Sequence, residues 1–317
     1  MRSMSRSATA IGRPVARRSL ARRMLMNWQL YLFILPAVAF FAIFQYGPMY
    51  GLQLAFKDFI ASEGIWRSPW IGLHNFQTFF SSFFFWQLFT NTLTISGYSL
   101  LAGFPFPILL ALALNEVRNR RYKKLVQTVS YAPHFISTVV MVGMILIFLH
   151  PESGMVNALL KALGRQPVSF MSKGSYFQSI YVWTGVWQSL GWNSVIFFAT
   201  LASVDPQQHE AAVIDGASRM QRIWYINIPV IMPTVIILFI LNAGQIMNVG
   251  FEKIFLMQNQ LNSSASEVIA TYVYKMGVQG GRFAFSTAVG LFNSVINCAV
   301  LLIVNRVAKA VSSVGIW

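Results

Sequence analysis

The most informative feature of this 317-residue sequence is how little charge it carries. Asp, Glu, Lys and Arg make up 10% of the chain, whereas 56% of the residues are hydrophobic. A soluble domain of ordinary composition carries roughly 25% charged residues. The deficit therefore places the chain among membrane proteins before any motif is considered.

Cysteine and histidine are also scarce, and their scarcity limits the available chemistry. The single cysteine, Cys298, excludes a disulfide within the chain. The four histidines, His74, His134, His150 and His209, lack the spacing of a metal-binding motif. We therefore expect no metal site.

Acidic residues are few, nine against 24 basic residues, which gives a formal net charge of +15. In a nucleic-acid-binding protein the basic residues would gather on one face. Here they flank the apolar runs instead. We interpret them as signals of membrane topology, and we expect contact with a lipid bilayer and none with nucleic acid.

Six apolar runs are long enough to cross a bilayer, which takes about 20 residues. None contains Asp, Glu, Lys or Arg. Pro105 and Pro107 are expected to kink the second run, and the sequence at 131–138 to break the third. We predict an all-α membrane protein with six transmembrane helices, at 28–54, 88–114, 125–149, 177–201, 228–249 and 285–304.

The distribution of basic residues predicts the orientation of these spans. With six spans both termini lie on one side, and 16 of the 24 basic residues fall on that side. Basic loops remain in the cytoplasm, so both termini are expected there. We predict a basic cytoplasmic tail at 1–27, one membrane domain at 28–310 and a short cytoplasmic tail at 311–317. The first tail also has the composition of a transit peptide, but the apolar run after it is too long for a signal peptide.

A short charged segment separates the fourth and fifth spans. Asp205 and Pro206 are typical of a helix N-cap and first residue, and Gln208 could complete a capping box. Gly216 allows the chain to turn. These signals predict a cytoplasmic helix at about 206–219.

The surface of this helix combines small residues with one acid. Ala211 and Ala212 would let another backbone come close, and Glu210 would be accessible at that contact. Composition alone leaves two interpretations open, a docking surface or a helix resting on lipid headgroups.

The spacing in this segment resembles the cytoplasmic motif of permease subunits in bacterial binding-protein-dependent ABC importers. That motif is E-A-A, three residues, G, nine residues and I-x-L-P, and Ile228 stands here where Leu is usual. The resemblance implies that 206–219 is a coupling helix that fits a cleft on a cytoplasmic ATPase subunit. The coupling residues it implies are Glu210, Ala211, Ala212, Asp215, Gly216 and Ala217.

Longer stretches resemble the subclass that imports complex oligo- and polysaccharides, which includes the alginate permeases. They lie at 33–59, 70–80, 103–137, 191–194 and 248–259. The resemblance implies location in the bacterial cytoplasmic (inner) membrane, a second permease subunit in a heterodimer, two ATPases carrying ATP and Mg, and an external solute-binding protein. The chain has no GxxxxGK[ST] phosphate loop, so we expect a transport subunit that is not itself an enzyme, with no catalytic residue and no cofactor bound by this chain.

Polar side chains within the spans are candidates for the path of the substrate. At 100° per residue, the candidates of the fifth span lie within an arc of roughly 120°, and those of the sixth share one face. Amides and aromatic rings suit sugars, but polar side chains also tie transmembrane helices together, and both interpretations stay open. The candidates are Trp183, Trp187, Gln188, Trp192, Asn193, Asn242, Gln245, Asn248, Glu252, Asn293 and Asn297.

Two other classes of membrane protein are alternatives to an ABC permease. An ion-coupled secondary transporter of a small solute usually carries carboxylates inside its spans, and none lies inside these. A membrane enzyme needs acid or histidine groups at one depth, whereas these are scattered over loops on both sides. Both alternatives are therefore less favoured than the permease.

Overall fold

The computed structural model describes residues 27–317, so most of the predicted basic tail lies outside the described residues. All regular elements in the described range are helical, and one isolated bridge joins Lys57 to Trp70. The chain divides into two units, Met1–Leu52 and Gln53–Trp317. The described residues therefore match the predicted all-α class.

The first unit is a helix that is apolar along its whole length. It consists of α2 (Trp28–Phe41), a π-helical turn (Ala42–Tyr46) and α3 (Gly47–Met49), and it continues as a 3-10 helix (Tyr50–Phe56) into the second unit. α2 buries no side chain, although nearly all of its residues are hydrophobic. A helix that is hydrophobic all round is typical of a membrane span.

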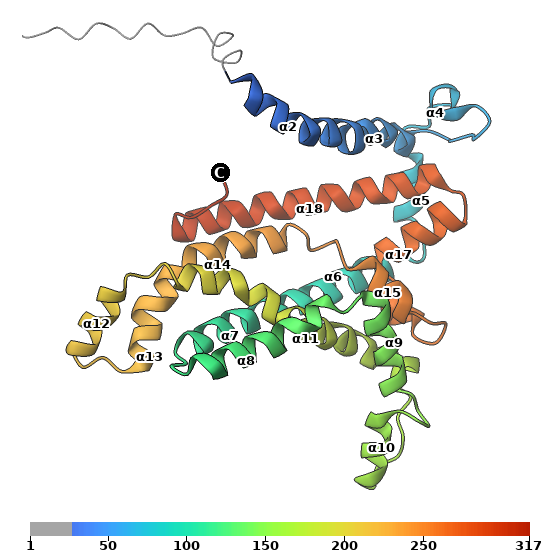
Figure 1. The fold of residues 1–317 in the computed structure, drawn as a ribbon. Coiled ribbons are helices and arrows are strands. Elements are labelled where there is room, and N and C mark those ends of the chain that lie inside the picture. The colour runs from blue at the N-terminus through green and yellow to red at the C-terminus, as the bar shows by residue number, and fades with distance from the viewer. Residues whose placement is uncertain (1–26) are drawn as a thin grey trace, which may run out of the picture. The chain divides into compact units, whose positions relative to one another are not determined.

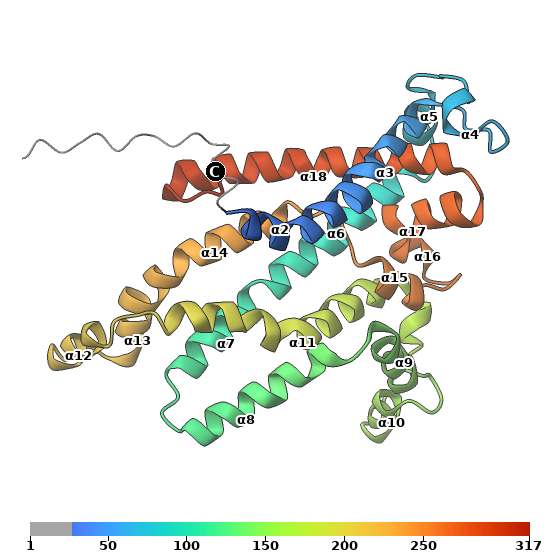
Figure 2. The ribbon, with the colours of Figure 1, turned by 45° about the horizontal axis from the view of Figure 1, so that its top comes forward.

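The second unit is organised around α11 (Gly174–Leu201), which packs against α6, α7, α8 and α14 (Figure 1). α12 and α13 lie at one end of this unit, and α9, α10 and α15 to α17 lie at the other (Figure 2). The remaining helices are α4 (Gly64–Arg67), α5 (His74–Phe80), α6 (Phe85–Gly103), α7 (Pro105–Asn115), α8 (Arg120–Tyr131), α9 (Thr138–Phe148), α10 (Met155–Ala162), α12 (Pro206–Ile214), α13 (Arg219–Arg222), α14 (Ile228–Ala243), α15 (Phe251–Met257), α16 (Ser263–Ser266), α17 (Ile269–Tyr274) and α18 (Phe283–Ser312).

The structure shows four or five helices suited to crossing a membrane, where the sequence predicts six. The four are Trp28–Phe56, Phe85–Asn115, Arg219–Ala243 and Phe283–Ser312, and α8 with α9 would make a fifth. α11 covers the remaining predicted span and has 28 residues, but it is less apolar than these four.

Both predicted irregularities are present. The helix of the second span is interrupted at Phe104, directly before Pro105. In the third span, α8 and the 3-10 turn after it (Ala132–Phe135) form one helix, and α9 is bent from it by 99° after two extended residues. The predicted span 125–149 is therefore two helices at a steep angle and not one straight helix, because Pro133 and the extended backbone at Ile136 and Ser137 end the α-helical ladder.

The predicted fifth span at 228–249 starts where α14 starts, at Ile228, but it ends too late. α13 runs through a π-helical turn (Ile223–Asn227) into α14, so the continuous helix begins at Arg219. It ends at Ala243, and residues 244–247 form turns. At that end a Cβ on Gly244 would lie 2.6 Å from Leu301 Cδ1, so α14 and α18 approach closely where the helix stops.

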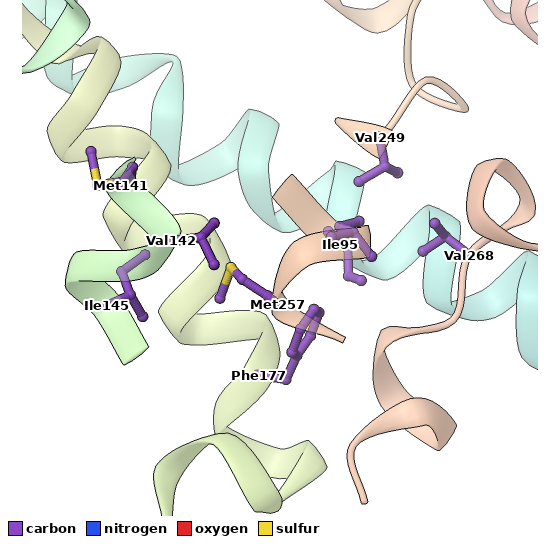
Figure 3. Close-up of a cluster of buried hydrophobic side chains, with 9 residues drawn as sticks. Ile95, Met141, Val142, Ile145, Phe177, Val249, Met257 and Val268 are labelled. Carbon is purple, nitrogen blue, oxygen red and sulfur yellow. The ribbon is translucent and has the colours of Figure 1, made fainter. Parts of the chain in front are cut away.

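Three clusters of buried apolar side chains hold the second unit together. Figure 3 shows the one formed by α6, α9, α11 and α15, where Met257 reaches toward Val142 and Phe177. A second cluster joins α5, α6, α17 and α18, and a third joins α7, α11 and α14. α11 thus contributes to two of the three clusters.

Candidate functional site

The helix predicted at about 206–219 corresponds to α12, which starts with the predicted cap but ends at Ile214, five residues earlier than predicted. The Asp205 carboxylate accepts a hydrogen bond from the backbone N–H of Gln207 at 3.0 Å, and Pro206 is the first helical residue. The predicted capping box with Gln208 does not form. One accepted bond and the proline are sufficient to begin the helix.

α12 ends at a glycine that the backbone geometry requires. Gly216 has φ of +78°, in the left-handed region. Its N–H bonds to the Val213 carbonyl, and the N–H of Ala217 bonds to the Ala212 carbonyl at 2.8 Å. This pair of bonds is the Schellman arrangement, in which glycine is strongly favoured because it has no Cβ.

No other part of the chain that the structure describes covers the surface of α12. No residue of α12 is buried, and Ile214 is 85% exposed. Of the residues implied for coupling, Ala212 and Ala217 are half-buried, whereas Glu210, Ala211, Asp215 and Gly216 are exposed. The helix therefore presents both apolar and acidic groups outward.

An ion pair connects this end of the molecule to the second span. Arg222 Nη2, on α13, lies 3.5 Å from Glu116 Oε2, just past α7. The buried Asn227 donates from Nδ2 to Glu116 Oε1 at 3.4 Å. The sequence analysis missed this cluster, although Glu116 is the one acid in the basic segment between the second and third spans.

A cavity of about 540 Å³ lies between α6, α7, α11, α14 and α15. Of the predicted pathway residues, Gln188, Trp192, Asn193 and Asn242 line it. Asn242 also lines a neighbouring cavity of about 210 Å³ together with Gln245 and Asn248. Trp183, Trp187, Glu252, Asn293 and Asn297 line neither of these two cavities.

Several of these side chains also have contacts within the protein. Gln188 Nε2 donates to the Ile136 carbonyl at 2.9 Å, where the break after α8 leaves that carbonyl outside any helix. Trp192 stacks on His134 with ring centroids 4.5 Å apart and planes within 1°. Trp183 Nε1 donates to the Tyr98 hydroxyl at 2.8 Å. The fourth predicted span therefore supports the break between α8 and α9.

The polar candidates of the fifth and sixth spans meet one another. Asn248 Oδ1 accepts bonds from Asn293 Nδ2 at 3.0 Å and Asn297 Nδ2 at 3.1 Å, and Asn248 Nδ2 donates to Gln245 Oε1. Gln245 and Asn248 lie after the end of α14, so the prediction that the polar residues of this span share one face of a helix is wrong beyond Asn242. The helix stops at Ala243, and the arithmetic of 100° per residue no longer applies.

Lys253 is the charged residue that lines the larger cavity, and the sequence analysis did not single it out. Its Nζ donates to the Tyr181 carbonyl at 3.0 Å and to Thr184 Oγ1 at 2.9 Å, and it lies 4.9 Å from the centroid of the Tyr181 ring. Burial lowers the pKa of the Lys253 ammonium from 10.5 to about 8. A group with that pKa remains mainly protonated at neutral pH.

The comparison with known families identifies the family of this chain. The family model described as "Binding-protein-dependent transport system inner membrane component" matches residues 103–313. The chain belongs to this family. It is a transport permease of the inner membrane.

Relatives of this permease are similar over nearly its whole length. Protein LplB of Bacillus subtilis (strain 168) is 41% identical, over 91% of each chain. The polygalacturonan/rhamnogalacturonan transport system permease protein YteP of the same strain is 38% identical, over 95% of this chain and 94% of the relative.

Two solved structures also resemble this permease. A bacterial ABC transporter involved in the import of the acidic polysaccharide alginate matches with a TM-score of 0.86 and 41% identity, over 92% of this chain and 99% of that one. The alginate transporter in complex with alginate pentasaccharide-bound periplasmic protein matches with a TM-score of 0.86 and 40% identity, over 94% and 99%.

Proposed function

We propose that this permease forms, with a second permease subunit, the transmembrane path of an ATP-driven importer for an acidic oligo- or polysaccharide. The relatives transport polygalacturonan and alginate, both of which are polymers of sugar acids. In this proposal a solute-binding protein delivers the saccharide from outside, and two cytoplasmic ATPases that bind ATP and Mg supply the energy.

The observation that carries the proposal is the exposed, sharply ended helix α12. Its residues Glu210 to Ala217 are expected to contact the ATPase, and both termini are expected in the cytoplasm with α12. The six-span core then consists of the four apolar helices, the broken pair α8 and α9, and α11.

A displacement of α12 can be transmitted directly to the membrane-spanning helices. α13 continues into α14 as one helix from Arg219 to Ala243, and Glu116 ties the same region to the end of α7. A displacement of α12 would therefore move the second and fifth spans together, as a rigid-body alternation requires. The cavity between these spans and α11 is the proposed part of the saccharide path.

A Gly216→Val substitution tests the coupling in the reconstituted complete transporter. A side chain in the left-handed region costs about 1–2 kcal/mol, which corresponds to a factor of about 5–30. We expect ATP-driven uptake to fall by that factor while the chain remains in the membrane. Gly164→Val is the matched control, because Gly164 also has positive φ, at +72°, and an open Cβ position, but lies after α10. Equal uptake by the two variants would contradict the proposal.

Labelling of single cysteines tests the orientation. In a Cys298→Ala background, Phe83→Cys and Ile214→Cys place thiols at positions that are 90% and 85% exposed. A maleimide that cannot cross membranes should label residue 83 from outside intact cells and residue 214 only after permeabilisation. Labelling of residue 214 from outside would refute a cytoplasmic α12, and a secondary transporter would then be the better description.

A further inference from the structure

A buried positive charge lines the larger cavity, and it has no negative partner among residues 27–317, which the structure describes. Lys253 is 8% exposed, and it lines the cavity from α15. The ion pairs within the described residues are Arg222–Glu116 and Lys275–Glu267, and neither involves Lys253. A buried charge is costly unless it is paired, so this one calls for an explanation.

The contacts of Lys253 leave room for one further acceptor. An ammonium has three N–H donors. Two are directed to the Tyr181 carbonyl and to Thr184 Oγ1, which are both neutral acceptors. Gly185 lies next to the ammonium, and a Cβ there would stand 3.4 Å from Nζ. The glycine thus leaves the space beside the charge open on a residue that lines the cavity.

A second, independent group in this cavity also lacks a partner. The Ser99 hydroxyl, on α6, is buried and forms no hydrogen bond in the described structure, yet Ser99 lines both cavities. Buried hydroxyls are nearly always hydrogen-bonded. Ser99 has a hydroxyl without a partner and Lys253 has an ammonium without a counter-charge, and both residues line one cavity, which suits a ligand that carries both hydroxyl groups and a negative charge.

We propose that Lys253 is a specificity-determining residue of the transport path, and that it binds the carboxylate of a uronic acid residue as the saccharide passes through the cavity. This inference rests on the proposed function and names one residue that would select its substrate class. A carboxylate is the anion that a sugar acid supplies, and a hydrogen bond between it and an ammonium is about twice as strong as one between neutral groups.

The test compares trigalacturonate with its fully methyl-esterified form, which has the same length and stereochemistry but no charge. Equilibrium binding of each sugar is measured on the complete transporter in nanodiscs, without binding protein. Lys253→Met removes the charge, Lys253→Arg keeps it, and Lys173→Met removes an exposed charge that does not line the cavity. ATP-driven uptake of both sugars is then measured in proteoliposomes with one binding protein for all variants.

The wild type should bind trigalacturonate more tightly than the ester by about tenfold to a hundredfold, the worth of one hydrogen bond to a charged group. Lys253→Met should remove this preference and leave ester binding unchanged, whereas Lys253→Arg and Lys173→Met should retain it. Uptake should follow the same order.

Three results would overturn the inference. The first is a wild type that binds both sugars equally well. The second is a Lys253→Met variant that still prefers trigalacturonate. The third is a Lys253→Met variant in which the binding of both sugars is weakened equally. The last would show that Lys253 only ties α15 to α11. Failure of the wild type to take up either sugar with ATP would refute the proposed function itself. That result comes from the uptake measurement in proteoliposomes, whereas the inference about Lys253 is tested by the binding measurement in nanodiscs.

Discussion

Replacement of Gly191 by alanine should destabilise the permease although it adds a single methyl group. Gly191 lies in the middle of α11 and is buried. A Cβ at this position would stand 2.2 Å from the Ser130 carbonyl oxygen and 2.4 Å from its carbon, at the end of α8. These are backbone atoms of a helix, so no side-chain rotation can relieve the clash.

The magnitude follows from the distance that the helices would have to move. A carbon and a carbonyl oxygen normally approach to about 3.3 Å. α8 and α11 would therefore have to separate by about 1 Å, and overpacking of this kind costs about 1–3 kcal/mol. The gain in helix propensity from glycine to alanine is about 1 kcal/mol, and it offsets only part of the cost.

Gly97 on α6 is the matched control, since a Cβ there meets nothing within 4 Å. Gly97→Ala should show the gain without the clash, so the two variants should differ by about 1–3 kcal/mol. For a chain of 317 residues that corresponds to about 1.5–4.5 °C in the apparent midpoint of thermal unfolding.

The assay is the loss of the monodisperse peak in size-exclusion chromatography after heating the complete transporter in detergent for a fixed time. The expected order of midpoints is Gly97→Ala, wild type, Gly191→Ala. Midpoints that coincide for the two variants would show that α8 and α11 are not in the close contact described, and the argument would fail.

Three further predictions concern the polar contacts. Glu116→Gln and Arg222→Met should each lower the midpoint of thermal unfolding. The stability lost in the double variant should be about 1 kcal/mol smaller than the sum of the two single losses, because the ion pair is mostly buried. Strictly additive losses would exclude a direct ion pair. Asn248→Leu removes three amide hydrogen bonds and should lower the free energy of unfolding by about 2–3 kcal/mol. Asn242 bonds only within its own helix, so Asn242→Leu should cost less. Equal unfolding midpoints for the two variants would refute the role of Asn248. The preference for trigalacturonate over the ester should fall as the pH rises above about 8, where the Lys253 ammonium loses its proton, because a neutral amine no longer attracts the carboxylate. The Lys253→Arg variant should keep a constant preference over the same pH range. A wild-type preference that does not change with pH would count against the role of the charge.

The features predicted from the sequence are those that depend on neighbours along the chain. Apolar length located four long apolar helices, Asp205 and Pro206 located the start of α12, and Gly216 located the turn that follows α12. The break in the third span was visible in Pro133 and the residues around it. In each case the physical cause lies within a few residues of its effect.

The features that were missed depend on contacts between distant segments. Glu116 and Arg222 are 106 positions apart in sequence, so no local pattern pairs them. The helical stripe of the fifth span was wrong because α14 ends beside Leu301 of α18. Lys253 follows the fifth predicted span in the sequence, and only its packing against α11 shows that it is buried.

The single cysteine gives this permease a built-in attachment point for spectroscopy. Cys298 is the only thiol of the chain, and it is exposed on α18. A nitroxide bound there reports from one known position, with no cysteine to remove and none to add. Because α18 is a single 30-residue helix, the spectrum would record the environment of one continuous element.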